Sequence, residues 1–300
     1  GGGLLLDFGR ELHGSVELFT PMTKDKSPVR VRVRFGESVG EAMAEPGGER
    51  NAGNDHALRD QIVLLPWLGK TTVGASGFRF VRLDAVEPER PVQLSHVRAV
   101  LRLRDIPYRG SFRCNDERLN RIWQVGAYTV HLNMQEYLWD GIKRDRLVWI
   151  GDMHPEVSTI NAVFGFNEVV ARSLDFTRDR TPVEEWMNSI SSYSMWWVLI
   201  QEEQWLHHGD RNYLEAQKNY LTKLLQRLGK FVGERRCHGV VHQQNDLAPL
   251  FQGRHLNTRV DVARARNTRR DPHHLVLVGC ADRNGVVHVL GSASGRSGQS

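Results

Sequence analysis

Hydrophobic and polar residues alternate in short runs over the first hundred positions of this 300-residue chain. In the clearest run, 29–35, three valines and a phenylalanine alternate with three arginines, which predicts a β-strand with one buried face. Similar runs occupy 4–8, 15–19, 61–65, 78–83 and 97–103, with glycine, proline and aspartate between them. Short strands at this spacing predict an antiparallel β-sandwich domain over residues 1–106.

Several charged residues in this region could form either a binding site or ordinary surface structure. They are Asp7, Arg10, Glu11, Glu37, Asp55, Arg59 and Asp60. Because charged side chains commonly occupy turns and strand ends, we interpret them as ion pairs and a solvent-exposed face rather than as a site.

The pattern changes to a helical period after residues 107–110, which we interpret as a linker. Asn115 is a candidate cap for a helix that extends to about residue 137. The stripe expected to be buried on this helix contains Leu119, Ile122, Trp123, Gly126, Val130 and Asn133. Further helical patterns cover 153–164, 167–179, 192–208 and 211–231. Short connections between them predict antiparallel neighbours, as in a bundle or a toroid of helical hairpins.

The formal net charge of +5 comes from the last part of the chain. Residues 233–300 contain ten arginines, no lysine and five acidic residues, whereas 1–232 contain 30 basic and 30 acidic residues. Tryptophan and tyrosine do not occur after Tyr220. We therefore interpret 233–300 as an atypical basic tail, either unstructured or non-native in sequence, with nucleic-acid binding as a weaker alternative.

Composition argues against several other classes of protein. No run of about eighteen apolar residues occurs, so no membrane span is expected. Cys114, Cys237 and Cys280 show no CxxC spacing, which indicates neither a disulfide framework nor a zinc site. No cofactor or metal is expected, and the sequence leaves the cellular compartment and the oligomeric state open.

The segment 140–152, Asp-Gly-Ile-Lys-Arg-Asp-Arg-Leu-Val-Trp-Ile-Gly-Asp, concentrates the charged residues that could perform chemistry. Asp140, Asp145 and Asp152 lie among three basic residues, together with Trp149 and two glycines. Such a mixture is costly to bury unless its charges are paired or serve a site. The segment is therefore either a salt-bridged turn before a helix or a charged loop at the mouth of a pocket.

Glycoside hydrolysis would suit these residue types, because it requires one carboxylic acid to protonate the leaving oxygen and a second carboxylate. Neighbouring aspartates and the indole of Trp149 could keep an acid protonated, and Arg144 could balance whichever carboxylate stays ionised. Trp186, Tyr193, Trp196 and Trp197 could extend an aromatic platform for a sugar, although core packing is favoured for Trp196 and Trp197. Periodicity and charge alone indicate only that the protein is an enzyme with a pocket or a sugar-binding protein.

The same segment, 140–152, resembles the active-site motif of bacterial α-L-rhamnosidases of glycoside hydrolase family 78, especially their Bacteroides-like branch. The resemblance also includes 7–11, 36–38, 54–55, 59–60, 76–80, 186–188, 191–194 and 208–210. It covers residues 1–232 and implies a β-sandwich followed, over 107–232, by the first helices of an (α/α)6 catalytic barrel.

By this resemblance Asp145 holds the general-acid position of an inverting, exo-acting enzyme that removes terminal α-L-rhamnose. Asp140, Arg144, Trp149 and Asp152 match positions that bind rhamnose, and we add Trp186 as a further substrate-binding candidate. The partner implied is a rhamnose-containing oligosaccharide or glycoside, with no nucleic acid and no membrane. No position matches the second carboxylate, and we do not assign that role to Glu156, Glu184 or Glu185, so the chain is expected to be incomplete as an enzyme.

Two alternatives belong to other functional classes. The first is a non-catalytic carbohydrate-binding protein that uses the same loop without turnover. The second is nucleic-acid binding through the basic tail, which ranks well behind because residues 1–232 have no excess of positive charge.

Overall fold

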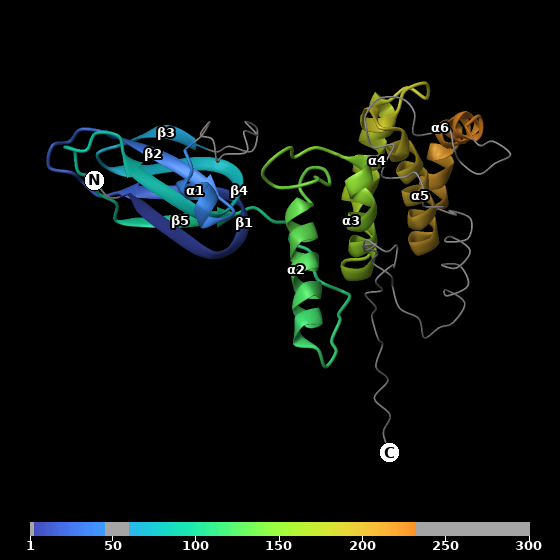
Figure 1. The fold of residues 1–300 in the computed structure, drawn as a ribbon, viewed down its shortest axis with the longest axis horizontal. Coiled ribbons are helices and arrows are strands. Elements are labelled where there is room, and N and C mark those ends of the chain that lie inside the picture. The colour runs from blue at the N-terminus through green and yellow to red at the C-terminus, as the bar shows by residue number, and fades with distance from the viewer. Residues whose placement is uncertain (1–2, 46–59, 232–300) are drawn as a thin grey trace, which may run out of the picture. The chain divides into compact units, whose positions relative to one another are not determined.

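The computed structural model describes residues 3–45 and 60–231, and the ribbon follows them in Figure 1. Contacts divide the chain into two compact units. The sheet unit comprises Gly1–Arg104, His131–Gln135 and Trp139–Leu147, and the helical unit comprises Asp105–Val130, Glu136–Leu138 and Val148–Ser300. The predicted tail at 233–300, and the charged residues Asp55 and Arg59, lie outside the described residues.

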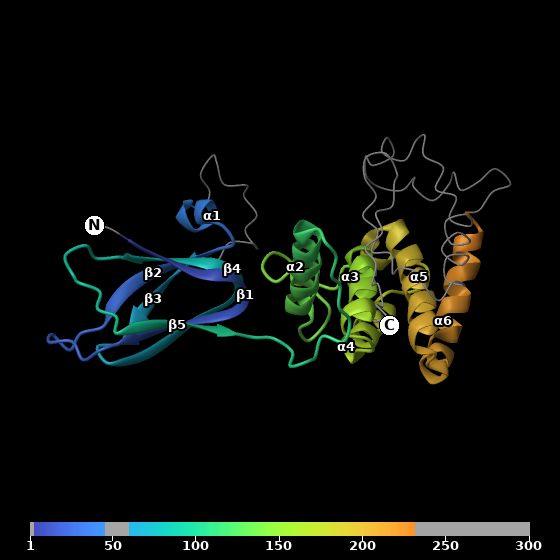
Figure 2. The same ribbon diagram turned by 90° about the horizontal axis from the view of Figure 1, so that it is seen from below.

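All described strands of the sheet unit join one five-stranded sheet in the order β3-β2-β4-β1-β5. The strands are β1 (Leu4–Thr20), β2 (Val29–Gly36), β3 (Asp60–Leu65), β4 (Gly69–Ala85) and β5 (His96–Leu101). Every pairing is antiparallel, as the sequence predicted, and Figures 1 and 2 show the sheet from two sides. The runs predicted at 4–8 and 15–19 form a single long strand, β1.

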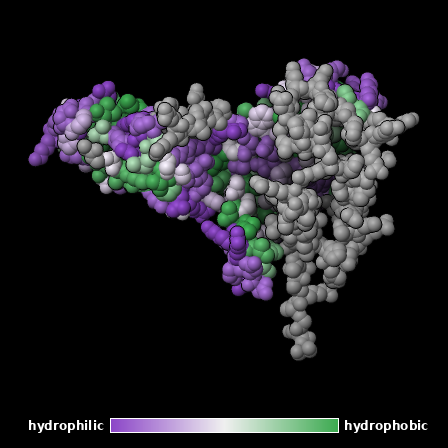
Figure 3. Space-filling model, viewed as in Figure 1, coloured by the Kyte–Doolittle hydropathy of each residue, from purple (hydrophilic) through white to green (hydrophobic). Residues whose placement is uncertain are grey.

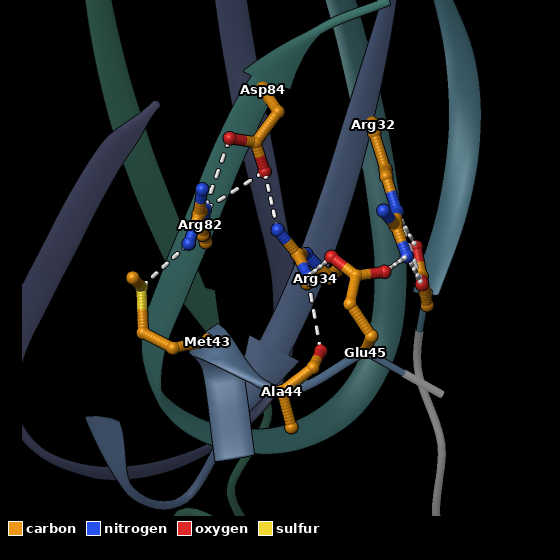
Figure 4. A network of polar contacts seen from close by, with 8 residues as sticks. Arg32, Arg34, Met43, Ala44, Glu45, Arg82 and Asp84 are labelled. Carbon is orange, nitrogen blue, oxygen red and sulfur yellow. Dashed lines mark hydrogen bonds and ion pairs between the residues drawn. The ribbon is translucent and has the colours of Figure 1, made fainter. Parts of the chain in front are cut away.

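The alternation along β2 separates a hydrophobic face from an arginine face. Val31 and Val33 are fully buried in the core, whereas the arginines pair with acids on the other face. Arg34 is almost fully buried, and Glu45 and Asp84 accept hydrogen bonds from its guanidinium at 2.8 and 2.7 Å (Figure 4). A buried guanidinium needs such partners, since an unpaired charge in the interior is costly.

The interpretation of the other charged residues as surface ion pairs is confirmed in two cases and needs correction in a third. Asp60 accepts hydrogen bonds from Arg32, and Asp7 forms a two-bond pair with Arg79. Glu11, in contrast, is half-buried, and its carboxyl group lies in an acidic environment described below.

A short helix, α1 (Val39–Met43), packs against β2 and β4. The hydroxyl of Ser38 caps it by accepting a hydrogen bond from the backbone N–H of Glu41 at 3.1 Å. Gly36 permits the close approach, because a Cβ atom there would lie 2.6 Å from the backbone nitrogen of Ala42. The helix therefore presents Glu41 from a fixed position beside the sheet.

The helical unit contains α2 (Glu117–Asn133), α3 (Ile150–Val163), α4 (Glu168–Arg180), the 3-10 turn η1 (Met187–Ser189), α5 (Ser191–His208) and α6 (Arg211–Gly229). The last residues of α2 are grouped with the sheet unit. Helix α3 packs on α4 and α5, and α5 packs on α6, as both ribbon views show. The four helices predicted after residue 150 are confirmed within a few residues. No helix in the described part is long and apolar enough to cross a lipid bilayer.

Helix α2 differs from its prediction in its cap and in its buried face. The carboxylate of Asp116, not Asn115, accepts a hydrogen bond from the backbone of Arg118 at the start of the helix. Leu119 and Ile122 of the predicted buried stripe are 38% and 45% exposed, and Figure 3 shows hydrophobic residues over this helix. Val130 and Asn133 of the same stripe are buried, so the predicted face is confirmed only near the end of the helix. Which part of a helix face packs depends on the neighbours that are present.

Candidate functional site

The loop that contains Asp145 is closed at its base by Asp140. The backbone N–H of Asp140 donates to the carbonyl of Leu147 at 3.0 Å, and the Asp140 carboxylate accepts from the N–H of Leu147 at 2.9 Å. Two hydrogen bonds between the loop ends restrict how the intervening residues can move. Asp140 thus closes the loop in this structure, and its role as a ligand to the sugar, which the resemblance implied, stays a prediction.

Asp145 lies in the loop with about a tenth of its side chain exposed. Its carboxylate accepts two hydrogen bonds from the guanidinium of Arg144, at 3.1 Å from Nε and 2.7 Å from Nη2. The Arg144 side chain is 57% exposed, so it lies over the carboxylate from the solvent side. Arg144 was expected to balance whichever carboxylate stays ionised, and in this structure it pairs with Asp145, the candidate acid.

Residues on either side of this ion pair attach the loop to the sheet unit. Lys143 is buried, and its ammonium group donates to the carboxylate of Glu41 in α1 and to the carbonyl of Phe35 in β2. Ile142 is 6% exposed, and the guanidinium of Arg146 donates to the carbonyl of Ala75 at 3.4 Å.

Glu11 lies close to this lysine, and nothing in the sequence indicated that the pKa of its carboxyl group is raised. Burial, and then repulsion from Glu37 and Glu41, raise its pKa to about 8, while Lys143 and Arg79 act in the opposite direction. We call Glu11, Glu37 and Glu41 the glutamate cluster. No sequence pattern marks it, because its members are brought together by β1, the end of β2 and α1.

In the helical unit, Trp149 and Asp152 lie at the start of α3. Trp149 occupies the N-cap position, and its ring lies edge-to-face against Tyr193 of α5 with 6.2 Å between ring centres. Its indole nitrogen is buried and has no hydrogen-bond partner among the described residues. Asp152 is exposed in the first turn, where a carboxylate interacts favourably with the helix dipole.

Asn188 fixes the backbone around Trp149, a role that sequence reasoning missed. Its side-chain oxygen accepts from the N–H of Ile150 at 3.1 Å, and its side-chain nitrogen donates to the carbonyl of Val148 at 3.0 Å. Asn188 has a positive φ of 50°, which asparagine tolerates better than most residues. The motif 186–188 was part of the resemblance, but nothing in it indicated this bridging geometry.

The candidate aromatic platform is only partly available. Trp197 is fully buried and donates to the carbonyl of Leu174 at 3.2 Å, which confirms that it belongs to the core. Trp196 is half-buried against the ring of His154. Trp186 is also half-buried, and the guanidinium of Arg227 lies 3.5 Å from its ring centre. Arg227 therefore occupies one face of Trp186, which leaves at most the other face for a sugar.

Other features of the described residues do not suggest a second catalytic site. A shallow hollow of 540 Å³ runs along α4, but it contains no residue of the motif, and Arg180 lies over its Phe176 ring. No group of His, Cys, Asp and Glu side chains in the described ranges is arranged to hold a metal ion. Cys114 has a free thiol, whereas Cys237 and Cys280 lie outside those ranges.

Comparison with known families identifies the helical region. Residues 107–248 match the bacterial α-L-rhamnosidase six-hairpin glycosidase domain. The helical region of this chain is therefore similar to α-L-rhamnosidase-like glycosidases. The match includes the whole 140–152 motif and extends beyond residue 232, where the sequence resemblance was expected to end.

Individual relatives agree with this match. An α-L-rhamnosidase of Formosa agariphila is 30% identical over 78 residues, which are 26% of this chain and 8% of that protein. The rhamnosidase of Klebsiella oxytoca with rhamnose bound superposes with a TM-score of 0.71 at 18% identity, over 82% of this chain and 51% of that one. The family 78 rhamnosidase of Bacillus sp. GL1 gives a TM-score of 0.66 at 22% identity, over 83% and 26%. The chain thus shares the fold of the two solved rhamnosidases, and it spans about half, or less, of the length of each relative.

Proposed function

We propose that this chain is part of an inverting, exo-acting α-L-rhamnosidase in which Asp145 is the general acid. The observation on which this rests is the placement of Asp145, a carboxylate with limited exposure in a loop whose ends are joined by hydrogen bonds. The fold shared with a rhamnosidase that binds rhamnose supports the choice of sugar. The Bacteroides-like resemblance of the motif supports the choice of residue.

In the proposed reaction, Asp145 donates a proton to the glycosidic oxygen as the bond from that oxygen to the anomeric carbon breaks. Water attacks the anomeric carbon from the opposite face and loses a proton to a second carboxylate, about 6.5–9.5 Å from the acid in inverting enzymes. We assign this base to no residue here. Glu156 is buried in α3, which does not suit an activator of bulk water.

The ion pair with Arg144 has a consequence for this mechanism. A guanidinium held by two hydrogen bonds favours the ionised carboxylate, whereas a general acid must hold a proton when the substrate is bound. We propose that the sugar displaces the Arg144 side chain from Asp145. Because Arg144 is 57% exposed, it can turn toward solvent or toward a sugar hydroxyl without disturbing buried structure.

The test is release of p-nitrophenol from its α-L-rhamnoside, measured for this chain and for a version extended to the length of the solved relatives. Asp145→Asn should lower kcat/KM of the extended protein on this substrate by up to about 10²-fold, because its leaving group needs little help from a proton. Asp179→Asn, an exposed carboxylate paired with Arg178, is the matched control and should leave the rate unchanged. An inactive extended protein, or an Asp145→Asn variant as active as the extended parent, would refute the proposal.

Two further measurements test the inverting stereochemistry and distinguish an enzyme from a non-catalytic sugar-binding protein. Nuclear magnetic resonance of the first-formed sugar should detect the β-anomer if the enzyme inverts the anomeric centre. Calorimetry should detect rhamnose binding by the extended protein; binding without any hydrolysis would instead support the alternative of a non-catalytic carbohydrate-binding protein.

A further inference from the structure

The centre of the loop that contains Asp145 is held by a lysine with almost no solvent exposure. Lys143 is 3% exposed, and its ammonium group pairs with Glu41 and lies 3.5 Å from the carbonyl of Phe35. An ammonium group at this depth remains charged only if partners replace the water that it has lost. The contacts with Glu41 and Phe35 therefore favour a single position for the loop backbone at residue 143.

Glu41 is itself fixed, so the pairing is more than a contact between two flexible side chains. Its second carboxylate oxygen accepts a hydrogen bond from the backbone N–H of Glu37 at 2.7 Å. Its own backbone N–H donates to the capping hydroxyl of Ser38. The lysine is thus attached to a helix terminus whose position is set by α1 and β2.

Packing beside Lys143 restricts the loop in the same place. A Cβ atom on Gly77 of β4 would lie 2.6 Å from Cγ1 of Ile142 and 3.2 Å from Cβ of Lys143. Real side chains almost never approach so closely, so the loop can occupy this position only because residue 77 is glycine. Lys143 and Ile142 together attach the loop to the sheet by a charged contact and an apolar contact.

We propose that Lys143 is a positioning residue that, paired with Glu41, sets the orientation of Asp145 two residues further along the loop. The catalytic role of Lys143 rests on the proposed function of Asp145. The attachment of the loop by Lys143 does not depend on that proposed function. Asp140 and Leu147 join the two ends of the loop, and Lys143 joins its centre to the sheet unit. The backbone of Arg144 and Asp145 therefore has little freedom to move.

Hydrogen–deuterium exchange of the 300-residue chain tests the attachment without any assay of activity. Lys143→Met and, independently, Glu41→Gln should each speed amide exchange within 139–147 by at least about tenfold, because either change breaks an ion pair whose lysine is almost fully buried. Strands β1 and β4 should exchange as in the parent. Lys218→Met is the matched control, since Lys218 forms an exposed pair with Glu215 and should change nothing in the loop. Unchanged exchange in 139–147 for both variants would overturn the proposal.

The extended protein tests whether the attachment serves catalysis. A misplaced acid slows substrates with a poor leaving group more than substrates with a good one, whereas partial unfolding slows both equally. Lys143→Met should therefore reduce kcat/KM for methyl α-L-rhamnoside at least about tenfold more than for p-nitrophenyl α-L-rhamnoside. Equal losses would contradict the positioning role. If the extended parent were inactive, the proposed function would fail, and the exchange experiment would still decide whether Lys143 holds the loop.

Discussion

Replacing Gly151 by alanine tests how tightly the start of α3 is packed beside Trp149 and Asp152. A Cβ atom at this position would lie 2.5 Å from Cζ of Tyr193 and closer still to the adjacent ring carbon Cε1. The ring cannot avoid it by a small bend, because Tyr193 lies in the first turn of α5 and packs edge-to-face against Trp149. The substitution must therefore separate the first turns of α3 and α5.

The expected cost follows from two opposing effects. Inserting a methyl group into a packed contact usually destabilises a protein by about 1–3 kcal/mol. Alanine in place of glycine inside a helix stabilises it by about 0.5–1 kcal/mol. The net prediction for Gly151→Ala is a loss of about 1–2 kcal/mol in the free energy of unfolding of the helical unit.

Gly126→Ala in α2 is the matched control, because a Cβ atom there would meet no heavy atom within 4 Å. It should gain about 0.5–1 kcal/mol. Urea unfolding followed by far-ultraviolet circular dichroism measures both variants. In a Tyr193→Ala background the clash is absent, and Gly151→Ala should become stabilising like the control. The reasoning is refuted if Gly151→Ala stabilises the parent chain as much as Gly126→Ala does.

Three other predictions concern single side chains. Glu11→Gln should stabilise the sheet unit by about 1–3 kcal/mol above pH 8 and by almost nothing near pH 4. The folded carboxyl group has a pKa of about 8 and retains a proton that the unfolded chain loses near pH 4.5, so the stability of the parent falls as the pH rises from 4.5 to 8. The partial exposure of Glu11 limits the size of the effect. Urea midpoints measured from pH 4 to pH 9 check this, and a pH-independent difference would contradict it. Asn188→Ala should lower the free energy of unfolding by about 2–3 kcal/mol, because the two hydrogen bonds from its side chain to the backbone of Val148 and Ile150 are lost. Chemical denaturation measures this, and a loss below about 0.5 kcal/mol would be inconsistent with the bridging role. Trp197→Phe should lower the melting temperature, since the buried carbonyl of Leu174 loses its donor, and an unchanged melting temperature would argue against that hydrogen bond.

Local sequence patterns were sufficient for much of the fold. The valines of β2 are buried as their alternation predicted. Gly209 and Asp210 form one of the short connections predicted between helices. Gly209 adopts a positive φ of 63° at the end of α5, and Asp210 caps α6 by accepting from the N–H of Tyr213. Such features depend on neighbours in the sequence, which is why they can be predicted from it.

The candidate site was less predictable, because its geometry depends on residues far apart in the chain. Lys143 pairs with Glu41, 102 positions away, and no local pattern distinguishes this buried lysine from an exposed one. The pairing of Arg144 with Asp145, rather than with another aspartate, is decided by side-chain geometry within the loop. Sequence reasoning therefore found the motif but not the contacts that position its members.

The central claim is that Asp145 supplies the proton to the departing oxygen, and substrate dependence in the Asp145→Asn variant tests it most directly. The measurement compares kcat/KM of the extended parent and variant on methyl and p-nitrophenyl α-L-rhamnosides. If Asp145 is the acid, the variant should lose about 10⁴-fold on the methyl glycoside and about 10²-fold or less on the nitrophenyl glycoside, whose leaving group needs less help from a proton. Equal losses on the two substrates, or none, would show that the proton comes from another group.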